Sequence, residues 1–119
     1  MNLELTILSN LVYNERYARK VLPFLKAEYF TDKSHKIIFL EIHEYISQYD
    51  SLPSLNALSI ECQERVDLTD EQFQTILEIL NVLSDDTSDY DWIVDTTEKW
   101  CQERAIYLSL MESVKIADG

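Results

Sequence analysis

The stretch DYDWIVDTTEKWCQERAIYLSLMESVKI, residues 89–116, decides the fold, because neither glycine nor proline interrupts it. At a rise of 1.5 Å per residue, about 27 helical residues form a rod of roughly 40 Å. The part of the chain that precedes it is about 90 residues long and would fold into a body only about 30 Å across. We therefore expect a long C-terminal helix that extends beyond the body of its own chain.

Apolar residues occur along the whole length of this stretch. The early ones can pack on the body of the chain: Tyr90, Ile93, Val94, Trp100 and Cys101. The late ones fall where no earlier helix is expected to cover them: Tyr107, Leu108, Leu110, Met111 and Val114. Because exposed apolar surface usually marks an interaction site, we predict that these five late residues form a partner interface.

Helical signals also fill the residues before the long stretch. Gly119 is the only glycine, and apolar residues recur at spacings of three and four, which is the helical period. The first two predicted helices cover residues 2–13 and 15–22. The third is capped by Asp32 or Ser34, and the fourth covers residues 55–65. The fifth begins at a capping box formed by Thr69 and Gln72. Pro23 ends the second helix, and Asp50, Ser51 and Pro53 form a turn after the third.

The predicted fold is therefore all-α, a compact bundle of about six helices with a long C-terminal helix. We expect residues 1–88 to form a globular helical part and residues 89–119 to form the long helix. The predicted core residues share an apolar side chain on the inner face of a helix or turn: Phe30, Ile38, Phe39, Ile42, Phe73, Leu77, Leu80, Ile93 and Trp100.

Composition excludes several classes of function. A phosphate-binding loop needs glycine where the backbone approaches the phosphates, and the only glycine is residue 119. The two cysteines, Cys62 and Cys101, lie far apart, and no apolar run approaches the roughly 20 residues of a membrane span. We expect a soluble intracellular protein with reduced thiols and with no cofactor.

Charge is distributed unevenly along the chain. The net charge is −12, which argues against a surface that follows nucleic-acid phosphates. Residues 1–36 hold six bases and four acids, a balance of +2, and the remainder holds four bases and eighteen acids, a balance of −14. The six bases are Arg16, Arg19, Lys20, Lys26, Lys33 and Lys36. We interpret them as a solvated face, and the overall charge as better suited to protein partners than to DNA.

Histidines, cysteines and acids offer only weak candidate sites. His35 and His43 are eight residues apart, whereas helical zinc ligands are normally four apart. Cys62 and Cys101 lack a CxxC spacing and are expected to be small core residues. The acidic run contains Asp85, Asp86, Asp89, Asp91 and Asp95. We interpret it as the start of the long helix, where the helix dipole favours negative charge, with partner docking or a metal site as alternatives.

The order of several motifs resembles a known family. A first apolar helix opens with Glu4, and "LKAEYF", "HKIIFLEIHEYI", "SLPSLNAL" and "DWIVDTTEKWCQERA" follow in turn. This order is similar to that of the amino-terminal domain of DnaB-type replicative helicases, and most like the variants of T-even-type tailed phages. The resemblance covers roughly residues 3–106 and consists of packing residues, with no catalytic group. Within it, Tyr29 and Phe30 are expected to pack inward.

The resemblance implies a role in a larger assembly. In that family the domain is a six-helix globule followed by a helical hairpin, and paired hairpins build a collar on a hexameric ring. The resemblance implies that residues 89–116 form the first arm of the hairpin. It also implies contact with primase or a helicase loader, and a separate motor domain that hydrolyses ATP or GTP with Mg²⁺. DNA would be bound only through the ring, in the cytoplasm of an infected bacterium.

Two other classes of function are compatible with the residues. The acidic segment could belong to a free-standing phage protein that mimics DNA or acts as an adaptor, if its carboxylates were spaced like phosphates. A small metal-dependent enzyme could use His35, His43 and the aspartates. We expect neither, and we expect no catalysis by this chain.

Overall fold

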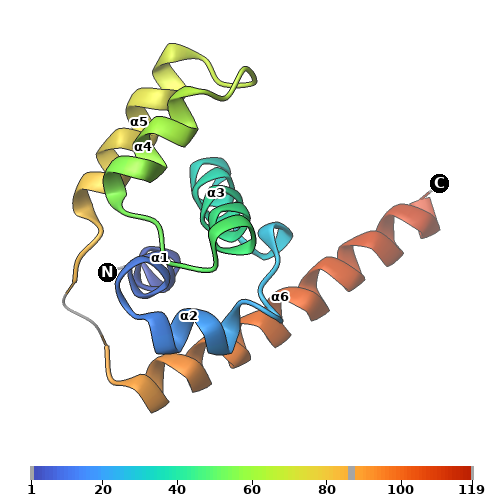
Figure 1. Ribbon diagram of the computed structural model, residues 1–119. Coiled ribbons are helices and arrows are strands. Elements are labelled where there is room, and N and C mark those ends of the chain that lie inside the picture. The colour runs from blue at the N-terminus through green and yellow to red at the C-terminus, as the bar shows by residue number, and fades with distance from the viewer. Residues whose placement is uncertain (1, 86–87, 119) are drawn as a thin grey trace.

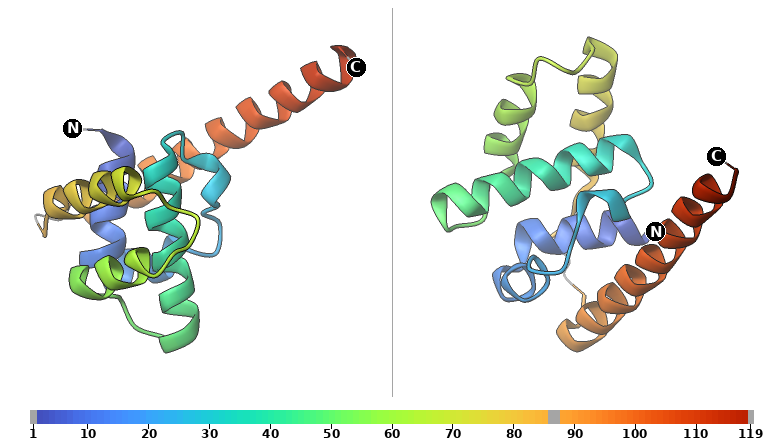
Figure 2. Two further views of the ribbon diagram at one scale, coloured as in Figure 1. Left: turned by 90° about the horizontal axis from the view of Figure 1, so that it is seen from above. Right: turned by 90° about the vertical axis from the view of Figure 1, so that its right-hand side faces the viewer.

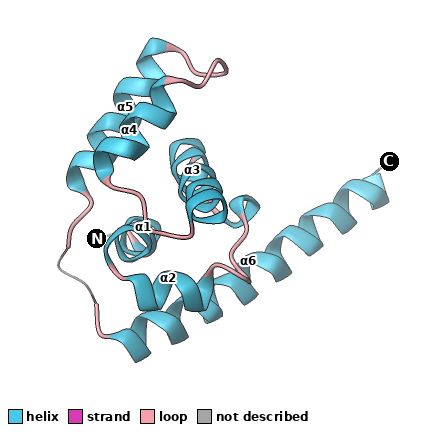
Figure 3. Cartoon of the chain, viewed as in Figure 1, coloured by secondary structure: helices cyan, strands magenta, loops and turns pink. Residues whose placement is uncertain are grey.

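The computed structural model describes residues 2–85 and 88–118, and every regular element in these residues is helical. In chain order the elements are α1 (Leu3–Tyr13), α2 (Glu15–Val21), the 3₁₀ turn η1 (Ala27–Tyr29), α3 (Lys33–Tyr49), α4 (Leu55–Gln63), α5 (Asp70–Val82) and α6 (Tyr90–Asp118). Figure 3 shows the helices joined by short loops, without a strand among the described residues. The predicted all-α class and the six helices are confirmed.

Side chains that accept hydrogen bonds from backbone N–H groups begin most of the helices. Asp32 accepts from the backbone N–H groups of Ser34 and His35 and caps α3, so of the two residues predicted for this cap it is Asp32 that acts. Ser54 caps α4, and Thr69 and Gln72 form the predicted capping box of α5. Asn2 and Asn14 cap α1 and α2. The two asparagine caps were not predicted.

The end of α3 depends on Asp50, which has the left-handed backbone conformation with φ 54° and ψ 32°. Glycine usually takes this position, and aspartate is one of the few other residues that tolerate it. Arg19 donates hydrogen bonds to the carboxylate and to the backbone carbonyl of Asp50, at 3.0 and 2.9 Å. This contact joins the end of α3 to α2 and directs the chain towards α4.

The hydrophobic core lies where α1, α2 and α3 pack on one another. α1 contributes Ile7, Leu8 and Leu11, which are fully buried. In Figure 1, α4 and α5 lie beside α3 on one side of this centre, and α6 passes below α2 on the other. α6 contacts the rest of the chain through α2 and η1.

The predicted core residues fall into two groups. Six of them are buried: Phe30, Ile38, Phe39, Ile42, Leu80 and Ile93. Phe73, Leu77 and Trp100 are only partly buried, so they do not have the core position expected of them. Phe73 and Leu77 lie on α5, which packs against α3 and α4 at the edge of the bundle. Trp100 packs against the buried cluster from the surface of α6.

The last helix is the longest element and leaves the body part-way along its length. α6 has 29 residues, which corresponds to about 43 Å, in a molecule that measures 45 × 37 × 29 Å. Figure 2 shows in both views that the C-terminal part of α6 points away from the other helices. The predicted overhang is therefore present.

Candidate functional site

The first half of α6 is fixed to the body by a buried hydrogen bond. The hydroxyls of Tyr17 on α2 and Thr97 on α6 are 2.7 Å apart. Thr97 donates its proton to the carbonyl of Ile93, at 2.6 Å, so the Tyr17 hydroxyl is the donor to Thr97. Burial raises the pKa of Tyr17 and outweighs the opposite effect of this hydrogen bond. The phenol therefore remains a neutral donor.

Aromatic and cationic contacts extend this attachment. Trp100 meets the rings of Tyr29 and Phe30 edge-on, with centroids 6.3 and 5.1 Å away. Arg104, one turn further on, donates from Nε to the backbone carbonyl of Tyr29 at 2.6 Å. At the start of α6, the Arg16 guanidinium lies 3.7 Å from the centroid of the Tyr90 ring. Polar and aromatic contacts with the body thus run from Tyr90 to Arg104, and Leu108, one turn further on, also packs against the core cluster.

Beyond Arg104 four apolar side chains of α6 face solvent. Tyr107, Leu110, Met111 and Val114 are 50%, 61%, 42% and 51% exposed, and we call these four residues the α6 stripe. Their spacing of three, one and three places them on one side of the helix. At 100° per residue, this side is rotated by roughly 75° from the side that carries Ile93, Thr97, Trp100, Cys101 and Arg104.

The structure places two apolar residues differently from the sequence prediction. Leu108 was expected in the partner interface, but it is partly buried and packs against the core cluster, next to η1, in a hollow that Tyr29 also lines. Ile106, which was not predicted, is 62% exposed. Trp92, near the start of α6, is also unusually exposed for its type, at 54%.

His35 belongs to a buried structural network. Its Nδ1 lies 2.9 Å from Oε1 of Glu4, and both side chains are 8% exposed. The backbone N–H and the hydroxyl of Thr31 donate to Oε2 of Glu4 at 3.1 and 2.7 Å. Burial alone would raise the pKa of Glu4, but the hydrogen bonds from His35 and Thr31 outweigh it and hold the pKa below 4.5. The network ties the start of α1 to the start of α3.

The residues proposed for a metal site are not brought together. His43 is exposed and packs beside Phe39, and eight residues separate it from His35 by about 12 Å along the helix. In residues 2–85 and 88–118, no group of three or more His, Cys, Asp or Glu side chains could hold a metal ion. Asp89 instead accepts a hydrogen bond from the backbone N–H of Trp92 at the start of α6. Asp85, Asp91 and Asp95 are exposed, and Asp86 lies outside the described residues.

Neither cysteine is poised for nucleophilic chemistry. Cys62 and Cys101 are buried free thiols. Burial is the main cause that raises both pKa values to about 11, with smaller contributions from Glu41 for Cys62 and from Glu98 for Cys101. Because the thiolate is the reactive form, these cysteines are unreactive near neutral pH.

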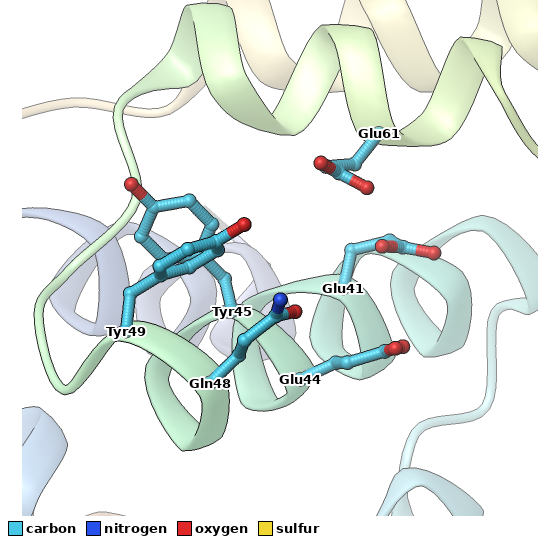
Figure 4. Close-up of a pocket in the computed structure, with 6 residues that line it drawn as sticks. All are labelled: Glu41, Glu44, Tyr45, Gln48, Tyr49 and Glu61. Carbon is cyan, nitrogen blue, oxygen red and sulfur yellow. The ribbon is translucent and has the colours of Figure 1, made fainter.

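A notch between α3 and α4 is lined by three glutamates. It is lined by Glu41, Glu44, Tyr45, Gln48, Tyr49 and Glu61 (Figure 4). Its volume of about 20 Å³ holds about one water molecule and no nucleotide. Glu41 is already paired with Arg65 at 2.7 Å, and Arg65 also binds Asp67 at 2.9 Å. These ion pairs hold the loop between α4 and α5 against α3.

The six predicted bases do not form one continuous site. Arg16 packs on Tyr90, and Arg19 is paired with Glu15 and Asp50. Lys20, Lys26 and Lys33 are exposed, and Lys36 is half-buried.

A hollow of about 330 Å³ beside α6 is lined by Phe24, Tyr29, Glu98, Cys101 and Gln102. Among the features described above, the α6 stripe is the candidate for a partner interface, because its four large apolar side chains are exposed on one face of the helix.

Comparisons with known proteins agree on one family. A family model for the DnaB-like helicase N terminal domain matches residues 1–95. A DnaB-like replicative helicase from Enterobacteria phage T4 is 32% identical over 110 residues, which cover 92% of this chain and 23% of that protein. The chain thus spans about a quarter of the length of this relative. Among the described residues, no helix is long and apolar enough to cross a membrane.

Proposed function

Because the chain belongs to the family of DnaB-like helicase N-terminal domains, we propose that it is the assembly and interaction domain of a phage replicative helicase. In this role it holds subunits together and contributes no catalytic group. Unwinding of DNA and hydrolysis of ATP or GTP with Mg²⁺ belong, in this proposal, to a motor domain elsewhere in a longer protein.

The α6 stripe is the observation that carries the proposal. Four large apolar side chains lie on one face of the part of α6 that projects from the body, each at least 42% exposed. Burial of a fully exposed side chain of this kind contributes roughly 1.5–3 kcal/mol, which is a strong incentive for a second helix to cover it. A second hairpin arm and the α6 segments of neighbouring subunits are the covering elements that the family role implies.

Contact with a primase or a helicase loader is the second part of the proposal. Its support is the acidic surface of the chain, which has a net charge of −12 and suits a partner with basic residues. The same acidity would suit a mimic of DNA, but membership of the helicase family favours a replication partner.

Replacement of stripe residues in the longer protein tests the assembly role. Leu110→Ser and Met111→Ser should each weaken subunit association about tenfold or more, because a loss of 1.4 kcal/mol at an interface corresponds to a factor of ten. Sedimentation velocity over a concentration series measures this. Val66→Ser, at a fully exposed valine between α4 and α5, is the matched control and should assemble normally. Association constants unchanged by both stripe variants would disprove the assembly role of the stripe.

A further inference from the structure

Arg104 stands at the point where α6 leaves the body. It makes the last hydrogen bond from α6 to another element among the described residues, from Nε to the carbonyl of Tyr29 at 2.6 Å. Its guanidinium also lies 5.0 Å from the ring centroid of Tyr107, the first residue of the α6 stripe. One side chain therefore contacts both the body and the projecting surface.

Two hydrogen bonds fix the direction of α6 relative to the body. One joins Thr97 to Tyr17, and the other joins Arg104 to Tyr29. Thr97 and Arg104 are about two helical turns apart, roughly 10 Å along the axis, and two fixed points on a rod define its direction. Trp100 packs between them on Tyr29 and Phe30. These edge-to-face contacts also favour one arrangement of the rings, and the hydrogen bond of Arg104 adds a further contact whose strength depends on angle.

The length of the projecting part makes this direction important. Fourteen residues follow Arg104 in α6, a length of about 21 Å. A tilt of about 10° at Arg104 would move the far end of the helix by about 4 Å over that length. If Thr97 were the last fixed point, the same tilt would move it by about 5–6 Å over about 32 Å. Val114, the last residue of the stripe, lies about 26 Å beyond Thr97, so the same tilt would move it by about 4–5 Å, which is close to the distance of about 5–6 Å between neighbouring side chains on a helix face.

We propose that Arg104 is a positioning residue, which sets both the direction of the projecting part of α6 and the orientation of the Tyr107 ring. The Arg104 guanidinium, which is bound to the carbonyl of Tyr29, also restrains the ring of Tyr107 through a cation–π contact. The consequence for assembly rests on the proposed function of the α6 stripe. The consequence for helix direction does not, because it concerns this chain alone.

The direction of α6 can be measured in the 119-residue chain. Spin labels are attached to cysteines introduced at two exposed positions, Ser47→Cys on α3 and Glu112→Cys on α6. Both native cysteines are buried, which directs labelling to the introduced pair. Pulsed electron paramagnetic resonance then gives the distribution of distances between the labels.

Arg104→Met removes the donors and the charge while keeping an unbranched apolar stem. We expect its distance distribution to broaden or shift by about 2–4 Å, by the same geometry applied to residue 112, and Arg104→Lys, which keeps the charge and one donor group, to give an intermediate result. Glu103→Gln, at an exposed neighbour, is the control and should match the parent chain. If Arg104→Met does not fold, Arg104→Lys alone decides. Distributions that superimpose on the parent would overturn the inference.

The assembly consequence is tested by comparison with Leu110→Ser in the longer protein. We expect Arg104→Met to weaken association about tenfold while equilibrium unfolding still shows a cooperatively folded domain. If Leu110→Ser weakens association and Arg104→Met does not, the role of Arg104 in assembly is wrong and the proposed function stands. If neither Leu110→Ser nor Met111→Ser weakens association, the proposed function fails, and the distance measurement still decides whether Arg104 sets the helix direction.

Discussion

Glu4 is a buried acid whose contribution to stability depends on pH. Its pKa in the folded chain lies below the ordinary value of 4.5, because the hydrogen bonds of His35 and Thr31 outweigh the effect of burial. A carboxyl with a lowered pKa stabilises the fold above its unfolded pKa, and this contribution is lost as the pH falls through the folded pKa. The start of α1 should therefore be a site of acid sensitivity.

The Glu4→Gln variant tests this. At pH 7 we expect the free energy of unfolding to fall by about 1.5–3 kcal/mol, the usual contribution of hydrogen bonds to a charged group. Below about pH 4.5 the difference from the parent should shrink, because the parent also loses the charge. Urea denaturation at a series of pH values measures both. Glu78→Gln, which changes an exposed acid on α5, is the control. If the free energy of unfolding of Glu4→Gln differs from that of the parent by the same amount at all pH values, Glu4 is not the acid-sensitive group.

The sequence predicts the burial of a single residue only where apolar residues recur at helical spacing. Ile38 and Ile42 lie on one helical stripe and are fully buried. The pairing of Glu4 with His35 spans 31 positions, and no local pattern joins two residues so far apart. The spacing of His35 and His43 argues against a metal site, but nothing in the sequence indicates that Glu4 is the partner of His35.

Helix caps are the element-scale feature that the sequence predicts best, and Asp32 allows a clear test. Its carboxylate accepts from two backbone N–H groups at the start of α3, while the hydroxyl of Ser34 is not the cap. Asp32→Ala should lower the free energy of unfolding by about 1 kcal/mol, as loss of an N-cap usually does. Ser34→Ala, two residues away, should change it by less than about 0.5 kcal/mol. Urea midpoints distinguish the two, and equal losses would mean that the cap is assigned incorrectly.

Element boundaries set by local chemistry were predicted well, and faces set by tertiary packing were not. Thr69 and Gln72 form the predicted capping box, because a cap requires only residues close in sequence. Leu108 is predicted at the interface because it falls where no earlier helix is expected to cover it. Its actual contact depends on where the segment around η1 lies, and the sequence pattern gives no signal for that 3₁₀ turn.

At the scale of the whole molecule, the absence of glycine before residue 119 predicts that this chain does not bind nucleotides. Phosphate-binding loops need glycine where the backbone approaches the phosphates, and Gly119 is the only glycine of the chain. We expect no saturable ATP binding at millimolar concentration and no release of phosphate. Equilibrium dialysis and a phosphate assay measure these, with a longer protein that includes a motor domain as the positive control. Saturable binding by the 119-residue chain would disprove this prediction.

The uninterrupted course of α6 also has a mechanical consequence. The helix contains no proline or glycine between Tyr90 and Asp118, so it has no natural hinge at which its two halves could bend independently. A force applied at the free end would therefore act as a torque on Tyr17 and Tyr29, inside the globule. In the proposed assembly, strain between neighbouring subunits would in this way reach the interior of each subunit directly.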